Sequence, residues 1–309
     1  MRKLLSLTAT AAVAALALAG CSDPGTSTPE DDTITPESGA AVEEFDVTTI
    51  EPVADIAAMV PDTLVTADQL TNGASTDYPP GEFLLEDGQT PTGYDIDIVK
   101  ALAAVMGLSQ GVTNTAEFPT IIPALGTKFD IGASSFTITP ERIEQANMVS
   151  YLEVGSAFGV ATGNPKNFTP EDPCGFSIGV QNGTFQQEYA EELSAQCEAE
   201  GKEPITIQPL SLQSDITTKV VGGQYDATFA DAPVIGFASV QSGGQIEQIG
   251  DVIESAPQGI AIAKSDEQLT AAVQAAMQHL MDEGYLAQIL AVYGAEGSAL
   301  SQARVNPEV

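Results

Sequence analysis

The segment from Phe129 to Arg142 combines hydroxyl side chains with a cation, a pairing that suits the binding of an anion. It reads as a short strand, a hydroxyl-rich turn and a helix start, with Thr139 in the N-cap position. Arg142 then falls in the first helical turn, where a positive charge opposes the helix dipole. A guanidinium there can bind a carboxylate bidentately, with Ser135 and Thr137 completing the oxyanion shell. The alternative is an ordinary exposed helix arginine.

Two further segments place polar groups at the ends of strands. Residues 179–185 read as a strand that ends at an Asn-Gly pair before a helix, and backbone N–H groups at such a turn can bind an anion. Residues 225–232 read as a buried strand ending in Asp231, and open α/β sheets bind ligands at this end of their strands. The simpler interpretations are ordinary turn chemistry and one acid among 43 Asp and Glu residues.

The overall composition limits the chemistry that the chain can perform. Its 309 residues carry 43 Asp and Glu against 10 Lys and Arg, for a net charge of −33. This charge argues against nucleic acid as a partner, because phosphate binding needs basic patches. One His and three Cys leave little for a metal site or a Cys/His catalytic pair. We therefore expect no metal, no other cofactor and no catalytic residue, in a chain long enough for about two domains.

The N-terminus reads as an export signal. Two basic residues precede an apolar run over residues 4–19, and the Leu-Ala-Gly-Cys sequence ending at Cys21 resembles a bacterial lipobox. The interpretation is a lipoprotein signal peptide over residues 1–20 with lipid attached to Cys21, the alternative being an ordinary signal with an incidental cysteine. Residues 21–49 have the composition of an acidic, flexible tether. The predicted location is extracytoplasmic, anchored by lipid to the outer face of the cell membrane of a Gram-positive bacterium.

Two cysteines remain once Cys21 is assigned to lipid. Export places Cys174 and Cys197 in an oxidising compartment, where disulfides persist. We predict a bond between them, and two free buried thiols are the alternative.

From Ala54 onward, strand-like runs alternate with helical patterns, which predicts an α/β fold with mostly parallel strands. One predicted helix is capped by Ser265 and stopped by Gly284. The sole His279 lies at the margin of that helix's apolar face and suits a surface position better than catalysis. The predicted strands include residues 130–133, 177–181, 206–210, 226–230 and 260–263.

A further string, Gly93-Tyr94-Asp95-Ile96-Asp97-Ile98, leads directly into a helical pattern. With its downstream spacing it resembles the signature of the bacterial extracellular solute-binding proteins, family 3, which are receptors of polar amino acid ABC importers. The resemblance runs from about residue 64 to residue 293. It implies a two-lobed periplasmic-binding-protein type II fold, with two Rossmann-like lobes joined by two crossover strands near residues 158–161 and 253–261. Lobe 1 would take residues 50–157 and 258–309, and lobe 2 would take residues 158–257.

The resemblance also assigns roles to the polar segments. In that family an arginine grips the ligand α-carboxylate with hydroxyl support, and these roles fall on Arg142, Ser135 and Thr137, with Ser134 nearby. From the opposite lobe, the family's Gly-Val-x-x-Gly-Thr element implies that Gly183, Thr184 and Phe185 reach the carboxylate. The ligand ammonium would bind Asp231, while Tyr78 and Phe118 would form aromatic walls beside the ligand side chain. Each aromatic could instead be plain packing.

The implied function is that of a substrate-binding receptor of an ABC importer. It would act as a monomer, capturing a free polar or cationic amino acid between two closing lobes and delivering it to the permease subunits. Acidic amino acids fit less well, because no second basic residue is placed for a side-chain carboxylate. Two alternatives remain: an amino acid sensor lipoprotein without transport, and a cyclohexadienyl-dehydratase-like enzyme of the same fold.

Overall fold

The computed structural model describes residues 44–308, so the predicted signal peptide, the lipid site at Cys21 and most of the tether lie outside the described residues. An eight-stranded sheet runs through this part of the chain in the order β5-β1-β6-β11-β7-β10-β8-β9. A small sheet of β2 (Asp77–Tyr78), β3 (Glu82–Leu84) and β4 (Pro91–Thr92) lies apart from it. The strands of the large sheet are β1 (Gln69–Ala74), β5 (Gln110–Thr115), β6 (Ile131–Gly132), β7 (Ala146–Ala161), β8 (Ser177–Gln181), β9 (Thr206–Leu210), β10 (Ala227–Asp231) and β11 (Ile246–Ala263).

Both ends of the large sheet are parallel. Strand β1 pairs in parallel with β5 and β6, and β8 pairs in parallel with β9 and β10. The predicted α/β class with mostly parallel pairing is therefore confirmed at each end. We call β1, β5 and β6 with their helices and the small sheet lobe 1, and β8, β9 and β10 with their helices lobe 2.

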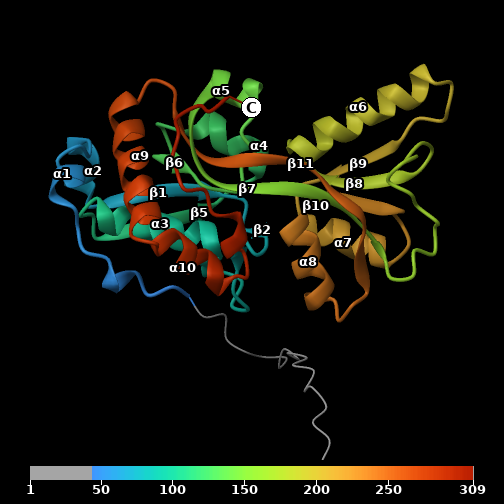
Figure 1. Ribbon diagram of the computed structural model, residues 1–309, viewed down its shortest axis with the longest axis horizontal. Coiled ribbons are helices and arrows are strands. Elements are labelled where there is room, and N and C mark those ends of the chain that lie inside the picture. The colour runs from blue at the N-terminus through green and yellow to red at the C-terminus, as the bar shows by residue number, and fades with distance from the viewer. Residues whose placement is uncertain (1–43, 309) are drawn as a thin grey trace, which may run out of the picture. The chain divides into compact units, whose positions relative to one another are not determined.

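Helices cover the sheet at each end (Figure 1). Helices α3, α9 and α10 lie over lobe 1, while α6, α7 and α8 surround lobe 2. The α-helices are α1 (Ala54–Ala57), α2 (Asp62–Ala67), α3 (Tyr94–Val105), α4 (Phe118–Ile121), α5 (Pro140–Gln145), α6 (Phe185–Ala199), α7 (Gln213–Val221), α8 (Ala232–Gln241), α9 (Glu267–Asp282) and α10 (Tyr285–Val292). Short 3₁₀ turns occupy Val47–Thr49, Ile122–Ala124 and Glu296–Ser298.

Two long antiparallel strands, β7 and β11, connect the lobes (Figure 1). The end of β7 pairs with β10 of lobe 2, while the end of β11 pairs with β6 of lobe 1. Their ladder is regular at both ends but shifts register between Ile249 and Ile253, between Ile253 and Ala256, and between Gln258 and Gly259. Register shifts weaken a ladder and allow it to bend, so this stretch is the natural place for one lobe to move against the other.

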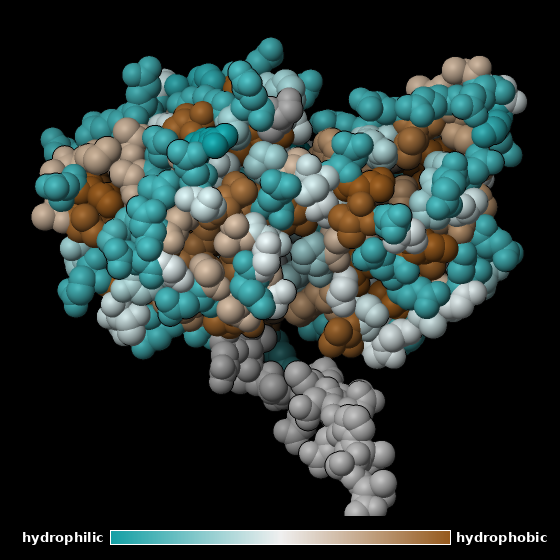
Figure 2. Space-filling view, viewed as in Figure 1, coloured by the Kyte–Doolittle hydropathy of each residue, from teal (hydrophilic) through white to brown (hydrophobic). Residues whose placement is uncertain are grey.

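Each lobe has its own apolar core. The largest buried cluster belongs to lobe 1 and includes Ile98, Leu102 and Val273, whereas Phe158 and Phe229 belong to a second cluster in lobe 2. Polar residues dominate the face of the molecule seen in Figure 2, and its apolar patches are small and separate. No helix among residues 44–308 combines the length and apolar character needed to cross a membrane.

Two local predictions have clear outcomes. The disulfide between Cys174 and Cys197 is present, which confirms that pairing and ties the end of α6 to the loop before β8. The predicted N-cap at Ser265 is wrong by one residue: Asp266 caps α9, because its Oδ1 accepts the Leu269 N–H at 2.9 Å. Gly284 follows α9 with φ of +76°, in line with its predicted role as a stop.

Candidate functional site

A small cavity of about 10 Å³ lies where side chains of the two lobes meet. Of the ten residues predicted to bind the ligand, seven line it, and Gln181 and Gln186 complete the wall. The structure thus brings together segments as far apart in sequence as β2 and α6. The predicted residues on the wall are Tyr78, Phe118, Ser135, Thr137, Arg142, Thr184 and Phe185.

Arg142 is held by carbonyl groups from both lobes. Its Nη1 donates to the Thr137 carbonyl at 2.7 Å, and its Nη2 donates to the Gly183 carbonyl at 3.2 Å. The guanidinium lies over the rings of Phe118 and Phe136, with Cζ 5.4 and 5.6 Å from their centroids. It is only 7% exposed, and among residues 44–308 no carboxylate lies within ion-pair distance of it. Burial lowers the pKa of Arg142, because the charged guanidinium has lost its contact with water. An anion bound here would compensate that charge.

The helix that carries Arg142 is short. Thr139 caps it as predicted, accepting the Arg142 N–H at 3.3 Å. Because α5 has only six residues, however, Arg142 lies close to both of its ends. The helix dipole therefore says less about the role of Arg142 than its burial and its two carbonyl partners do.

Asp231 lies beside the cavity at the junction of β10 and α8. It occupies the N-cap position of α8 but makes no side-chain cap bond, and Pro233 at the second helical position has no N–H to offer. Instead, Oδ1 accepts the Gln186 amide at 2.7 Å and Oδ2 accepts the Gln258 amide at 2.6 Å. Burial raises the pKa of Asp231 to about 7, against the opposing effect of those two donors.

Ser134 and Ser135 form hydrogen bonds with two buried acids, Glu82 and Asp95. Ser135 has φ of +49°, an uncommon conformation for a residue with a Cβ, and its N–H donates to Asp95 Oδ2 at 2.7 Å. Both serine hydroxyls donate to Glu82, from Ser134 at 2.7 Å and from Ser135 at 3.0 Å. Ser134 is fully buried and is not among the residues that line the cavity. Its predicted contact with ligand stays a prediction.

Glu82 and Asp95 form a buried acidic pair behind the serines, which sequence reasoning missed. Asp95 Oδ1 accepts the Tyr151 hydroxyl at 2.6 Å, and burial raises the pKa of Asp95 to about 6. Burial also raises the pKa of Glu82 well above its ordinary value. Glu82 belongs to the Tyr78 loop and Asp95 to the Gly-Tyr-Asp-Ile-Asp-Ile string, two segments that carry other predicted features.

Lobe 2 presents the turn between β8 and α6. Gly183 has φ of +77°, and a Cβ there would lie 3.0 Å from Cβ of Pro119 in lobe 1, so this turn needs glycine. Thr184 caps α6 by accepting the Gln187 N–H at 3.3 Å, and Phe185 follows as the first helical residue. The predicted strand end, turn and helix start are all present. The Gly183 N–H donates to Gln187 Oε1 at 2.8 Å, and the binding of an anion by this turn stays a prediction.

Three more hydrogen bonds join the lobes around the cavity. The Asp231 N–H donates to the Tyr78 hydroxyl at 2.9 Å, and Gln181 Nε2 donates to Ser75 Oγ at 3.0 Å. Asp77 Oδ2 accepts the Ser214 N–H at 2.9 Å. These direct contacts describe a closed arrangement. Of the residues in these pairs, Tyr78 and Asp231 were predicted as ligand contacts and the other four were not, although Gln181 stands at the carboxyl end of a correctly predicted strand.

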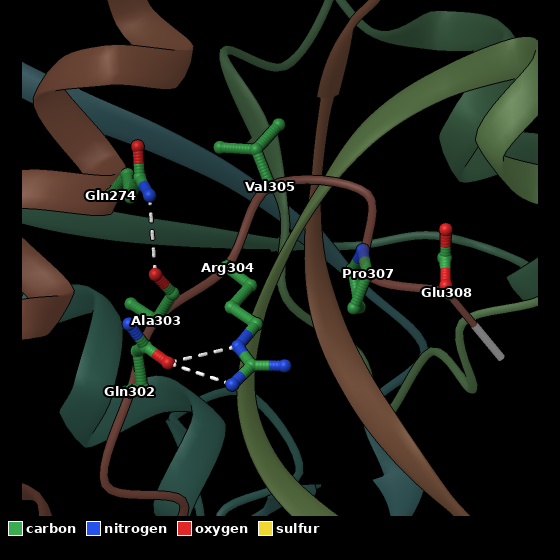
Figure 3. Close-up of a pocket in the computed structure, with 7 residues that line it drawn as sticks. All are labelled: Gln274, Gln302, Ala303, Arg304, Val305, Pro307 and Glu308. Atoms are coloured by element: carbon green, nitrogen blue, oxygen red, sulfur yellow. Dashed lines mark hydrogen bonds between the residues drawn. The ribbon is translucent and has the colours of Figure 1, made fainter.

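A second hollow, about 770 Å³ and open to solvent, contains none of the predicted residues (Figure 3). It lies between α9 and the C-terminal segment, where Arg304 points to Gln302 and its Nε and Nη2 donate to Gln302 Oε1 at 2.9 and 2.8 Å. Gln274 Nε2 donates to the Ala303 carbonyl at 3.1 Å. These bonds hold the C-terminal segment against α9, which is a structural role.

Comparison with known proteins places this architecture in a family. The sequence profile of the bacterial extracellular solute-binding proteins, family 3, matches residues 70–296. The chain is 40% identical over 261 residues to the arginine-binding protein ArgT of Corynebacterium glutamicum, covering 84% of each, and 30% identical to the L-arginine-binding protein of Pseudomonas aeruginosa, covering 70% of this chain and 84% of that one.

Solved structures agree with the sequence matches. An ancestral arginine-binding protein bound to arginine is 26% identical with a TM-score of 0.67, covering 74% of this chain and 98% of that one. An ancestral amino acid-binding protein described as a precursor of cyclohexadienyl dehydratase is 27% identical with a TM-score of 0.65, covering 75% and 98%. The predicted periplasmic-binding-protein type II fold is thereby confirmed. The chain belongs to the bacterial extracellular solute-binding proteins, family 3.

Proposed function

We propose that this protein is the substrate-binding receptor of an ABC importer and that its ligand is a cationic amino acid, L-arginine being the first candidate. The observation that carries the proposal is a pair of buried, opposite charges near the junction of the lobes: Arg142 lines the cavity, and Asp231 is hydrogen-bonded to the wall residue Gln186. Arg142 on lobe 1 would bind the ligand α-carboxylate, and Asp231 on lobe 2 would bind the α-ammonium group. Ser135, Thr137 and the turn at Gly183 and Thr184 would complete the carboxylate site.

The charges around the cavity favour a cationic side chain. Arg142 is the only cation among the nine wall residues, and the α-carboxylate would neutralise it. Asp77, Glu82 and Asp95 do not line the cavity, but they are half-buried or buried acids next to wall residues: Asp77 precedes Tyr78, and Glu82 and Asp95 accept hydrogen bonds from Ser135. Tyr78 and Phe118 would flank the aliphatic part of the side chain. The arginine-binding names of the relatives support the same choice.

Closure would be coupled to binding. A cavity of about 10 Å³ is smaller than any amino acid, so the ligand would enter an opened form and the lobes would then close on it. Because the proposed contacts come from both lobes, the ligand would bind the closed form more tightly and shift the population toward it. The bend would fall in the irregular stretch of β7 and β11, and a permease could then recognise the closed form.

The N-terminal sequence supports a proposed anchor. Lipid on Cys21 would hold the protein at the outer face of the cell membrane, and the acidic tether would space the lobes from it. Detergent phase partition tests this: wild type should enter the detergent phase, and Cys21→Ser should not. Equal partition of the two proteins would rule out the anchor.

A thermal-shift screen tests the ligand proposal. Residues 44–309 would be heated with each of the twenty amino acids, ornithine, citrulline and small amines. L-Arginine and the other cationic amino acids should raise the melting temperature of wild type and leave Arg142→Met unchanged. Stabilisation by acidic amino acids alone, or by no amino acid, would contradict the proposal.

Uptake of labelled L-arginine by cells without the gene separates the importer receptor from a sensor, since only the former predicts loss of uptake.

A further inference from the structure

Gln258 lies where β11 passes between the lobes. Its backbone is at the register shift before Gly259, and a bridge pairs it with Thr137 of lobe 1. Two backbone hydrogen bonds flank that bridge: the Ile138 N–H donates to the Pro257 carbonyl at 2.8 Å, and the Gly259 N–H donates to the Phe136 carbonyl at 2.9 Å. Gln258 is thus fixed next to the loop whose carbonyl holds Arg142.

The side chain of Gln258 reaches into lobe 2. Its Nε2 donates to Asp231 Oδ2 at 2.6 Å, and the residue is only 1% exposed. An ionised carboxylate only accepts hydrogen bonds, so it dictates that the amide nitrogen faces it. One residue therefore contacts the arginine loop through its backbone and the proposed ammonium site through its side chain.

The amide oxygen of Gln258 has no partner. Within residues 44–308, Gln258 Oε1 and Gln213 Oε1 are the two buried side-chain atoms without a hydrogen bond. An unpaired buried acceptor costs free energy, and an apolar residue of the same length would avoid that cost. The hydrogen bond from the amide nitrogen to Asp231 accounts for an amide at this position.

We propose that Gln258 is a positioning residue for amino acid recognition, holding the Asp231 carboxylate in place for the ligand α-ammonium group. The inference rests on the proposed function. With Oδ1 held by Gln186 and Oδ2 by Gln258, each oxygen keeps a lone pair for the ligand. Because Asp231 does not cap its own helix, these amides are the donors that orient its side chain among the described residues.

Calorimetry with two ligands tests this role in Gln258→Met, which keeps the length of the side chain but has no amide donor. The probes are L-arginine and 5-guanidinopentanoate, which is the same molecule without the α-ammonium group. Loss of a hydrogen bond to a charged group should weaken L-arginine binding about 10- to 100-fold, and the analogue should be nearly unaffected. Gln248→Met is the matched control, since Gln248 lies exposed on the same strand and its side chain donates only to the Gly250 carbonyl.

Equal losses for both probes would overturn the proposal, because they would show a role in folding or hinge movement alone. Unchanged binding of L-arginine would overturn it as well. Failure of wild type to bind L-arginine would instead refute the proposed function. If Gln258→Met does not fold, Gln258→Asn serves, because the shorter amide stays polar but cannot reach Asp231.

A measurement without ligand gives an independent readout. The ¹³C shift of the Asp231 carboxyl reports its titration, and removing one donor should raise its pKa in Gln258→Met relative to wild type and to Gln248→Met. The charged and titratable groups that act on Asp231 are Arg142, Asp95, Tyr78, Glu82 and Tyr94, and all are present in the three proteins. An identical titration in the three would refute the contact on which the proposal rests.

Discussion

Arg142 Nη2 lies 3.2 Å from the carbonyl oxygen of Gly183, so one hydrogen bond links α5 of lobe 1 to the turn before α6 of lobe 2. The same guanidinium binds the Thr137 carbonyl through Nη1. In the closed arrangement the cation is therefore solvated by neutral carbonyls of the protein. A ligand carboxylate would replace one neutral partner with an anionic one, which is a stronger hydrogen-bond acceptor.

Replacing Arg142 should remove amino acid binding. Arg142→Met leaves an apolar side chain beside two stacked phenylalanine rings and takes away the proposed partner of the α-carboxylate. Loss of one partner from a buried charge pair costs roughly 2–5 kcal/mol, which would weaken L-arginine binding by about 30-fold or more in calorimetry. Arg304→Met is the matched control, because Arg304 is exposed and bonds to Gln302. Similar affinities for the two variants would reject the assignment.

Binding should weaken as the pH falls through neutrality. Burial raises the pKa of Asp231 from 3.8 to about 7, so below this value the ligand-free protein holds a proton that the α-ammonium group must displace. Affinity for L-arginine should drop by up to about tenfold per pH unit below 7. Titrations from pH 5 to pH 8 check this, and Asp231→Asn should bind weakly at every pH. A wild-type affinity that is flat over this range would exclude Asp231 as the ammonium ligand.

The stability of the ligand-free protein should respond to pH in the opposite direction. Because the folded state raises the pKa of Asp231, it binds that proton more tightly than the unfolded state does. The resulting stability is complete below pH 3.8 and is lost as the pH rises toward 7. Melting curves without ligand should therefore show a smaller pH-dependent loss between pH 5 and pH 8 in Asp231→Asn than in wild type. Identical losses would mean that burial does not shift this group.

Asp77 should favour the closed form. Helix α7 begins after Leu212, which offers no side-chain cap, and the Ser214 N–H is bound instead by Asp77 of lobe 1. Because Asp77 and Ser214 meet only when the lobes are together, Asp77→Ala would destabilise the closed form and leave the open form unchanged. A cap is worth about 0.5–2 kcal/mol, so L-arginine affinity should fall about 2- to 30-fold. Asp87→Ala, which removes an exposed turn cap within lobe 1, should leave affinity unchanged. Equal behaviour of the two variants would show that Asp77 has no part in closure.

The disulfide should stabilise lobe 2 without affecting the ligand. Cys174 and Cys197 are 23 residues apart, and closing such a loop is worth about 2–4 kcal/mol. Cys197 lies twelve residues along α6 from Phe185, or about 18 Å at the helical rise. The double substitution Cys174→Ser with Cys197→Ser should lower the melting temperature and keep the L-arginine affinity. A large loss of affinity in a folded variant would show that the bond shapes the site.

Much of the fold follows from local signals in the sequence. Strands β8 and β9 have the predicted bounds, because apolar runs between turn residues mark their ends. Strand β11 was predicted only over its last four residues. Its first part is polar, half exposed and broken by register shifts, so no apolar periodicity marks it as a strand.

The site residues likewise divide into those that local sequence signals reveal and those that they do not. Arg142, Thr184 and Asp231 follow strand ends or helix starts, and such positions can be recognised from sequence. Gln258 cannot, because its contact with Asp231 depends on a strand crossing that no local pattern encodes. Glu82 was missed for a similar reason, since its serine partners lie more than fifty residues away.

The most direct test of the central claim is calorimetry of wild type with three related ligands. L-Arginine carries both α groups, agmatine lacks the carboxylate, and 5-guanidinopentanoate lacks the ammonium group. If Arg142 and Asp231 hold the two α groups between the lobes, L-arginine should bind with one site per chain, and each analogue should bind at least about 30-fold more weakly. Agmatine or 5-guanidinopentanoate binding as tightly as L-arginine would contradict the account.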